Sequence, residues 1–174
     1  MTPGKQKTIA FLTAAVAGGL VAFLLLRPES AEDRIRRRFD DFAAVLEKHA
    51  GEHAARSALK NEQLHAFFAD EVVIEGRIPF VSGRHTASEL SATISQLRLQ
   101  AESVSVHFDE VQVTVTSDDH ARASFHVRVS GRGKGDRGSD RRERHMSAVL
   151  VRIDGKWRFE QFAVIPDNDE EDDG

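Results

Sequence analysis

The chain of 174 residues contains no cysteine and no tyrosine, and its net charge is -4. The absence of cysteine excludes disulfides, thiolate metal sites, cysteine nucleophiles and a lipid-modified cysteine anchor. Six of the last eight residues are acidic and none is basic, so the rest of the chain carries a net charge of +2. Because this end has no apolar side chain to bury, residues 167–174 are predicted to form a disordered acidic tail.

An uncharged run near the N-terminus predicts a membrane anchor. After a short tail of residues 1–7, the nineteen residues from Thr8 to Leu26 contain no charge. As a helix rising ~1.5 Å per residue, this run just spans a bilayer core of ~30 Å. A secretory signal peptide is the alternative, but the run exceeds the usual ~7–15 apolar residues and ends without a small-x-small cleavage pair. We therefore expect residues 8–26 to be an uncleaved, single-pass transmembrane helix.

The charges around this run bear on its orientation. Lys5 and Lys7 precede it, whereas five arginines follow it within residues 27–38, which taken literally places the C-terminal side in the cytoplasm. However, most of these arginines belong to a predicted helix and are mixed with acidic residues, and large domains translocate despite their charge. A short, lysine-bearing N-terminus commonly stays inside. We expect an extracytoplasmic domain, with the opposite orientation as the alternative.

Helical spacing dominates the first part of the remaining chain. Ser30 and Asp33 mark a helix start, and Thr86 with Glu89 forms the pattern of a capping box. In chain order, the predicted elements are a helix from Ser30 to Gly51, a helix over Glu52–Phe68, a strand over Glu71–Gly76, a loop or edge segment over Ile78–Gly83 and a helix over Ala87–Leu99.

From Ser103 onward the apolar period changes to two. Val104, Val106 and Phe108 have one parity and Val111, Val113 and Val115 the other, so a β-bulge near Asp109 and Glu110 would keep all six on one face. A second strand follows Asp118-Asp119 and alternates from Ala121 to Ser130. The glycine-rich segment Gly131–Asp140 connects it to strands over Arg144–Ile153 and Lys156–Ile165, which are joined by an Asp154-Gly155 turn.

This order of elements predicts an α+β fold over residues 30–166, with three helices on one face of a curved, mainly antiparallel sheet. Together with Phe67–Asp70, Ser82–Arg84 and Val149–Phe159, it resembles the nuclear transport factor 2-like superfamily, and the SnoaL-like branch is nearest. The resemblance implies a cone-shaped domain with a pocket between sheet and helices, often forming a homodimer through the outer sheet face. It includes isomerases, dehydratases and cyclases as well as non-catalytic proteins, so it does not choose an activity.

The residue types exclude some of these activities. Ketosteroid isomerase and tyrosine-assisted dehydratase sites need a tyrosine hydroxyl, which the chain lacks. A SnoaL-type cyclase would need one carboxylate and one histidine, but no residue aligns with such a pair, so no catalytic residue is assigned. His49 and His53 have helical metal-ligand spacing, but Gly51 lies between them. We expect no metal and no cofactor.

Four residues are candidates for a ligand pocket: Glu75, Arg77, Trp157 and Gln161. Gln161 interrupts an otherwise apolar row that is predicted to face inward, formed by Trp157, Phe159, Ala163 and Ile165. A buried Glu75 would need Arg77 or another partner and would be a candidate general base. An exposed Glu75–Arg77 pair at the rim is the alternative. His107 and His126 have the outward parity of their strands, which favours solvent or a dimer interface.

The glycine-rich connection is also strongly basic. Its candidate binding residues are Arg132, Lys134, Arg137, Arg141 and Arg142. Such a hairpin could meet lipid phosphates, nucleic acid or the acidic tail of its own chain. Because no aromatic residue is interleaved for base stacking, nucleic acid is not expected. The alternative is a solvated hairpin without a partner.

Together these patterns predict a membrane-tethered, non-catalytic nuclear transport factor 2-like module that binds a protein partner or a small apolar ligand. The alternative is a small-molecule lyase, isomerase or cyclase of SnoaL-like type with a Glu75- or histidine-based acid-base site. An inward carboxylate and imidazole in one cavity would favour the enzyme, whereas an apolar cavity would favour the binding module.

Overall fold

The computed structural model describes residues 29–76, 78, 81–135 and 138–166. The predicted tail at residues 1–7, the predicted anchor at residues 8–26, Arg77, Arg137 and the acidic tail at residues 167–174 lie outside the described residues. Within the described ranges, no helix is long and apolar enough to cross a membrane. The chain divides into two compact units, Met1–Ser30 and Ala31–Gly174, and the second contains the folded domain.

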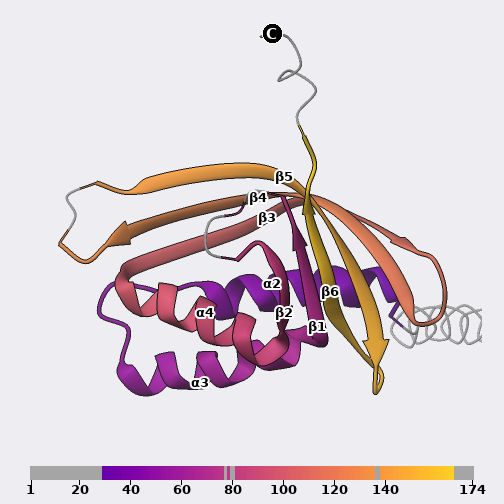
Figure 1. Ribbon diagram of the computed structural model, residues 1–174, viewed down its shortest axis with the longest axis horizontal. Helices are drawn as coiled ribbons and strands as arrows, with labels where there is room; N and C mark the ends of the chain where they lie inside the picture. Colours follow the sequence, from indigo (N-terminus) through magenta and orange to yellow (C-terminus); the bar gives the residue numbers. More distant parts are fainter. Residues whose placement is uncertain (1–28, 77, 79–80, 136–137, 167–174) are drawn as a thin grey trace, which may run out of the picture. The chain divides into compact units, whose positions relative to one another are not determined.

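The second unit is an α+β domain with helices on one face of a six-stranded sheet (Figure 1). Its helices are α2 (Ala31–Leu46), α3 (Ala54–Leu64), the 3-10 turn His65–Phe67 and α4 (Ala87–Gln100). Its strands are β1 (Phe68–Glu75), β2 (Gly83–Thr86), β3 (Ala101–Val115), β4 (His120–Gly133), β5 (Asp140–Ile153) and β6 (Lys156–Val164). The strand order is β2-β1-β6-β5-β4-β3, and β1 and β6 are the parallel pair in an otherwise antiparallel sheet. The predicted fold class is therefore confirmed.

Helix α2 lies against the sheet through one apolar stripe. Its buried residues Ile35, Phe39, Phe42 and Val45 recur at helical spacing. The Phe39 ring makes edge contacts with Phe108, Phe125 and Phe159, at centroid distances of 5.3, 4.9 and 5.0 Å. Each buried phenylalanine contributes roughly 1.5–3 kcal/mol by leaving water. This aromatic cluster joins the helical layer to the middle of the sheet.

The two strongest local signals in the sequence are confirmed. The Thr86 hydroxyl accepts the Glu89 backbone N–H at 3.2 Å, and the Glu89 carboxylate accepts the Thr86 backbone N–H at 2.8 Å, which completes the capping box. In β3, the pairing with β4 shifts between Asp109 and Gln112, where Glu110 has a φ of 55°. This bulge keeps the valines before and after it on the helix-covered face.

The predicted ends of the first two helices are wrong. Helix α2 ends at Leu46 rather than Gly51, because the Lys48 backbone exchanges two 2.8 Å hydrogen bonds with Val104 of β3. Helix α3 covers Ala54–Leu64 rather than Glu52–Phe68, since Phe68 already begins β1 and pairs with β6. Backbone pairing to distant strands therefore overrides helical periodicity at both ends.

The sheet also extends further than expected. The segment assigned to a loop or edge contributes the edge strand β2, which pairs with β1 through contacts such as Val73 opposite Arg84. The basic connection is shorter than Gly131–Asp140, because β4 continues to Gly133 and β5 already begins at Asp140. As a result, Arg132, Arg141 and Arg142 lie on strands, where alternation assigns each to one sheet face.

A buried polar cluster ties the ends of the three helices together. The Glu52 side chain, between α2 and α3, is 1% exposed, and the Arg98 side chain, in the last turn of α4, is 3% exposed. Arg98 Nη2 donates to Glu52 Oε1 at 3.1 Å, Nη1 to Asn61 Oδ1 at 2.6 Å and Nε to the Leu46 carbonyl at 3.2 Å. Residues of α2, α3 and α4 thus meet at one guanidinium.

Two lysines complete this cluster. Lys60 Nζ donates to the other Glu52 oxygen at 3.0 Å and to the Glu47 carbonyl at 2.6 Å. Lys48 Nζ donates to the Arg98 and Ala101 carbonyls at 2.8 and 2.7 Å, which satisfies acceptors at the end of α4. Burial by itself would raise the pKa of Glu52, but the hydrogen bond from Lys60 and the charges of Lys60 and Arg98 outweigh it and hold that pKa below its ordinary value.

Replacing Glu52 by glutamine is expected to destabilise the domain by about 3 kcal/mol, because the substitution leaves Arg98 buried without its countercharge. The measurement is the free energy of unfolding from urea titration. The matched control is Glu62→Gln, which removes an exposed carboxylate of α3 and is expected to change stability by less than about 0.5 kcal/mol. Equal effects of the two variants would contradict the structural role of Glu52.

The stabilities of the wild-type protein and of Glu52→Gln should also differ in their dependence on pH. Because the folded pKa of Glu52 lies below its ordinary value of 4.5, its stabilising contribution is fully present above that pH. The contribution is lost as the pH falls from there through the lowered folded pKa. The stability difference between the wild-type protein and Glu52→Gln should therefore be constant near neutral pH and shrink below about pH 4.5. A difference that stays constant into strong acid would contradict the ionised, paired state of Glu52.

Candidate ligand cavity

A cavity of about 180 Å³ lies between the sheet and the helices. It is lined by side chains from helices α2 and α4, from strands β1, β3, β4, β5 and β6, and from the segment before β2. These residues are Phe42, Leu46, Phe68, Ile74, Val81, Leu90, Ile94, Val106, Phe108, Phe125, Val127, Val129, Met146 and Phe162. All of the lining residues within the described ranges are apolar. We call this site the apolar cavity.

The apolar cavity is open at one end. Its deep wall contains fully buried residues such as Phe68 and Phe125, which are each 1% exposed. Toward the opening, Val127 and Ile94 are half-buried, and Val129 is 39% exposed. Large apolar side chains are costly to expose, so this partial exposure marks an entrance from solvent.

Among the described residues, the cavity lining contains no group able to transfer a proton. The chain has eight histidines, all within the described ranges, and none of them lines the apolar cavity. The same holds for the carboxylates among the described residues. General acid-base chemistry needs a titratable group within hydrogen-bond reach of the reacting atoms. What this lining provides instead is dispersion contact and exclusion of water.

Gln161 does not point into this cavity, which corrects the predicted inward row. The β5–β6 pairing shifts by one residue, from Leu150 opposite Phe159 to Val149 opposite Gln161. The shift turns Phe162 into the core, where it is 8% exposed, and turns Gln161 to the outer face. Ala163 and Ile165 are accordingly only half-buried rather than part of the core row.

Glu75 is exposed and joins Gln161 on the outer face of the sheet. Both line a depression of about 280 Å³, together with Arg122 of β4 and Val149 of β5. The proposed partner Arg77 lies outside the described residues. The structure therefore brings two of the predicted pocket residues together, but on the face opposite the apolar cavity and without a histidine in the lining.

Trp157, the remaining pocket candidate, is a core residue. It is 4% exposed and belongs to the hydrophobic cluster, but it does not line the apolar cavity. Its indole Nε1 is buried without a hydrogen-bond acceptor among the described residues. The residue packs in the core and is not part of the lining of the apolar cavity.

The histidines predicted to face outward do so. The His126 and His145 rings stack at a centroid distance of 4.6 Å with an interplanar angle of 7°. Glu110 lies beside His126, with 3.9 Å between His126 Nε2 and the Glu110 carboxylate, and Arg128 donates to Asp109 at 2.7 Å. His107 Nε2 lies 3.0 Å from the Ser105 hydroxyl. The outer face of the sheet is thus polar and internally paired.

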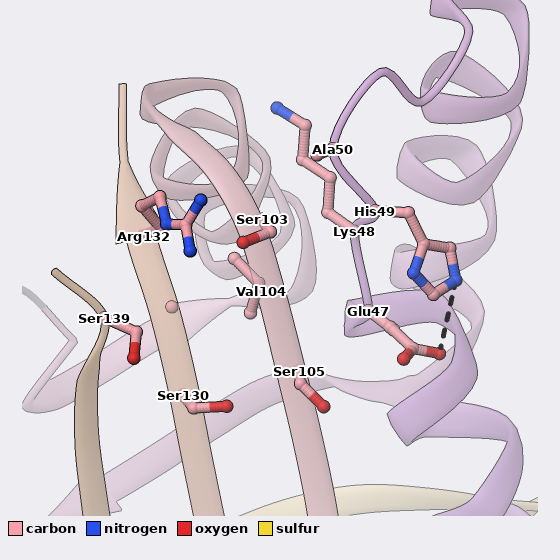
Figure 2. A pocket seen from close by; sticks show the side chains of 11 residues that line it. Glu47, Lys48, His49, Ala50, Ser103, Val104, Ser105, Ser130, Arg132 and Ser139 are labelled. Atoms are coloured by element: carbon pink, nitrogen blue, oxygen red, sulfur yellow. Dashed lines mark ion pairs between the residues drawn. The ribbon is translucent and has the colours of Figure 1, made fainter. Parts of the chain in front are cut away.

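The predicted basic residues do not converge on one site. Arg132 lines a polar depression of about 310 Å³ between β3, β4 and the segment after α2, together with Ser103, Ser105, Ser130 and Ser139 (Figure 2). Lys48 borders this depression, but its ammonium is engaged by the carbonyls at the end of α4. Arg141 pairs with Glu143 at 3.9 Å and Arg142 with Asp140 at 3.1 Å, and Arg137 lies outside the described residues. Lys134 is exposed in the turn after β4.

Metal binding finds no support in the part of the chain that the structure describes, which contains no group of three or more His, Cys, Asp or Glu side chains able to hold an ion. His53 instead caps α3, where its Nδ1 accepts the Ala55 backbone N–H at 3.4 Å. His49 is exposed, with 3.9 Å between its Nε2 and the Glu47 carboxylate (Figure 2).

The resemblance implied a pocket between sheet and helices, but the sequence reasoning missed the residues that line the apolar cavity and the Glu52–Arg98 cluster. One signal for the cluster was present: Arg98 continues the buried face of α4, eight residues after Leu90 and seven after Ser91. A charged residue on a buried helix face needs a buried partner. The cavity had no such signal, because its lining residues look like ordinary core residues in the sequence.

Comparisons with known proteins place the chain in a family. A family model of the SnoaL-like domain matches residues 33–163. No curated protein matches the chain. Among solved structures, an NTF2-like protein with a cystatin-like fold from Novosphingobium aromaticivorans is 19% identical, with a TM-score of 0.57 over 83% of this chain and 86% of that one.

Two further structures share the fold. The hexachlorocyclohexane dehydrochlorinase LinA type 2 is 15% identical, with a TM-score of 0.57 over 76% of this chain and 82% of that one. ActVI-ORFA from Streptomyces coelicolor is 15% identical, with a TM-score of 0.55 over 76% of this chain and 93% of that one. At these identities the structures establish the architecture and no activity. Since the family match covers most of the chain, this protein belongs to the SnoaL-like domain family and has the nuclear transport factor 2-like fold.

Proposed function

We propose that the SnoaL-like domain binds a small apolar molecule in the apolar cavity and carries out no acid-base chemistry on it. The observation that carries this proposal is the lining, in which every contributing residue within the described ranges is apolar. A ligand held there gains from leaving water and from contact with the aromatic wall. In the described part of the lining, it meets no side chain that could take or give a proton.

The size of the cavity limits the ligand. A dry apolar cavity of ~150 Å³ is known to accept benzene, whereas pockets for drug-sized ligands usually measure ~300–1,000 Å³. The volume of about 180 Å³ therefore suits a single ring or a short chain. Burying ~150 Å² of apolar surface at ~25 cal/mol per Å² gives about 4 kcal/mol, which corresponds to a Kd on the order of 1 mM. Tighter binding requires an additional contact outside the cavity.

The alternative function is a SnoaL-like lyase, isomerase or cyclase. LinA, which has a similar fold, is named as a dehydrochlorinase, and this favours an enzymatic function. For this chain, the alternative would have to use the outer depression that contains Glu75, because the apolar cavity holds no carboxylate or imidazole in its described lining. A Glu75 without a histidine beside it is a weak basis for acid-base catalysis.

The proposal includes the location of the domain. The uncharged length of Thr8–Leu26 supports attachment to a membrane as a single-pass anchor, and we place the domain on the extracytoplasmic side. A protein partner, including a second copy of this chain, would meet the outer sheet face. That face carries the stacked histidines and the depression around Gln161.

Replacing Val127 by phenylalanine is expected to weaken ligand binding at least about tenfold, because the larger ring occupies the apolar cavity. The measurement is calorimetric titration with hydrocinnamyl alcohol, a neutral molecule with one aromatic ring. Val111→Phe is the matched control, since Val111 is also half-buried and packs against the core but does not line the cavity. The control should bind within about twofold of the wild-type protein.

Two results would contradict the proposed function. One is the absence of binding to the wild-type protein at millimolar concentrations of the alcohol. The other is equal affinity of wild-type and Val127→Phe proteins when circular dichroism shows that both are folded.

The proposed location predicts the outcome of protease treatment. In right-side-out cells or vesicles, the domain should be digested without lysis, because an outward-facing domain is accessible to the added protease. Extraction of unlysed membranes with carbonate should leave the full-length chain in the membrane fraction. Digestion only after lysis would show that the orientation is wrong, and release by carbonate would show that residues 8–26 are not an anchor.

A further inference from the structure

A pair of arginines continues the inward row of β5 beyond the apolar cavity. Met146 lines the cavity, and the preceding residues of the same parity are Arg144 and Arg142. Arg144 lies directly opposite Val127 and Arg142 directly opposite Val129 in the β4–β5 ladder. Since directly paired residues share a sheet face, both arginines lie on the face that carries the cavity, next to its most exposed lining residue.

These arginines are accessible because β6 stops short of them. The last β5–β6 ladder pair is Met146 with Val164, and one further hydrogen bond joins the Ile165 N–H to the His145 carbonyl, so residues 140–144 of β5 extend beyond this pairing. Figure 1 shows the β4–β5 hairpin extending away from β6. Arg142 and Arg144 are exposed, and so is Val129 at 39%. The entrance of the apolar cavity and the two guanidinium groups therefore border the same open region.

Among the described residues, the charge of this region is positive. Arg142 forms an ion pair with Asp140 at 3.1 Å, and Asp140 has the same inward parity on β5. Arg144 donates one hydrogen bond to the Glu143 carbonyl at 3.0 Å, and within the described ranges it has no ion pair. One of the two guanidinium groups thus keeps free donors and an uncompensated charge. A guanidinium matches the planar, two-oxygen geometry of a carboxylate.

On the helical side, a partly exposed leucine follows the cavity lining along α4. Ile94 of α4 lines the cavity, and Leu97 follows one turn later and seven residues after the buried Leu90. Leu97 is 39% exposed, like Val129. The two elements α4 and β4 that line the cavity therefore each carry an exposed apolar side chain, Leu97 and Val129.

We infer that the ligand of the apolar cavity is a small free carboxylic acid, with its ring or short chain in the cavity and its carboxylate at Arg144 and Arg142. This inference rests on the proposed function and specifies its ligand class. The volume of about 180 Å³ accommodates one ring but not the two acyl chains of a phospholipid, which argues for a free acid over a membrane lipid. A cationic ligand would meet net positive charge at the entrance.

The test compares three probes with the same apolar part. Hydrocinnamate, hydrocinnamyl alcohol and phenylpropylamine each carry one phenyl ring on a three-carbon chain but differ in charge. By calorimetric titration of the full chain in detergent at low ionic strength, the acid should bind about five- to tenfold more tightly than the alcohol, and the amine more weakly than the alcohol. The preference for the acid should decrease with added salt, because the arginines are exposed.

Arginine variants test whether the preference for the acid over the alcohol depends on Arg142 and Arg144. Arg144→Gln, and more completely Arg142→Gln with Arg144→Gln, should bring the affinity for the acid down to that for the alcohol. Arg141→Gln is the matched control: its position on the same strand has the opposite parity, and it is 63% exposed, against 64% for Arg142. It should retain the preference. Unchanged binding of the alcohol to every variant would show that the cavity remains folded.

The outcomes separate this inference from the proposed function. Equal affinities of the wild-type protein for acid and alcohol would overturn the inference and leave the apolar cavity as a binding site. Persistence of the acid preference in the double variant, or its loss in Arg141→Gln, would overturn the assignment to Arg142 and Arg144. Failure of all three probes to bind would contradict the proposed function itself, and the inference with it.

Discussion

The arrangement of the three helices depends on one buried ion pair. Glu52 and Arg98 are almost completely removed from water, and through Arg98 the ends of α2, α3 and α4 are hydrogen-bonded to one guanidinium. A buried pair of this kind contributes little net stability over apolar packing, but loss of one partner is costly because the other charge stays buried. The cluster therefore fixes geometry: it holds the Leu46 end of α2 near the last turn of α4, and both helices form walls of the apolar cavity.

The strands show how well apolar alternation in the sequence predicts the sheet face on which a side chain lies. In β3 the parity of the valines changes across Asp109 and Glu110, and this visible change predicts the bulge that the register contains. In β6 the row from Trp157 through Ala163 is broken only by Gln161, and apolar residues of both parities follow it, so the signal of the second bulge is ambiguous. One inserted residue there reverses the faces of Gln161 and Phe162. The order and type of most elements could thus be predicted, whereas the pocket residues on β6 could not.

The resemblance implied a pocket between sheet and helices, but the residues that line it could not be predicted, for a different physical reason. Its lining comes from two helices, five strands and one connecting segment, and each contributes residues such as Leu90, Val106 or Phe162 that are typical of any core. A cavity arises where such side chains do not fill the space between layers, which depends on helix position rather than on residue type. The same limit applies to the arginines on β5. Their charge was evident from the sequence, but the sheet face on which they lie is given only by the pairing of Arg144 with Val127.

Methyl nuclear magnetic resonance can show whether ligand enters the space between α2, α4 and the sheet. With labelled isoleucine, leucine and valine methyl groups, hydrocinnamate should shift the signals of Ile94, Val106 and Val127, which line the cavity. It should leave Val111 and Val115 unchanged, because they pack against the core elsewhere. Shifts confined to Val149 on the outer face, or no shifts at saturating ligand, would contradict the account.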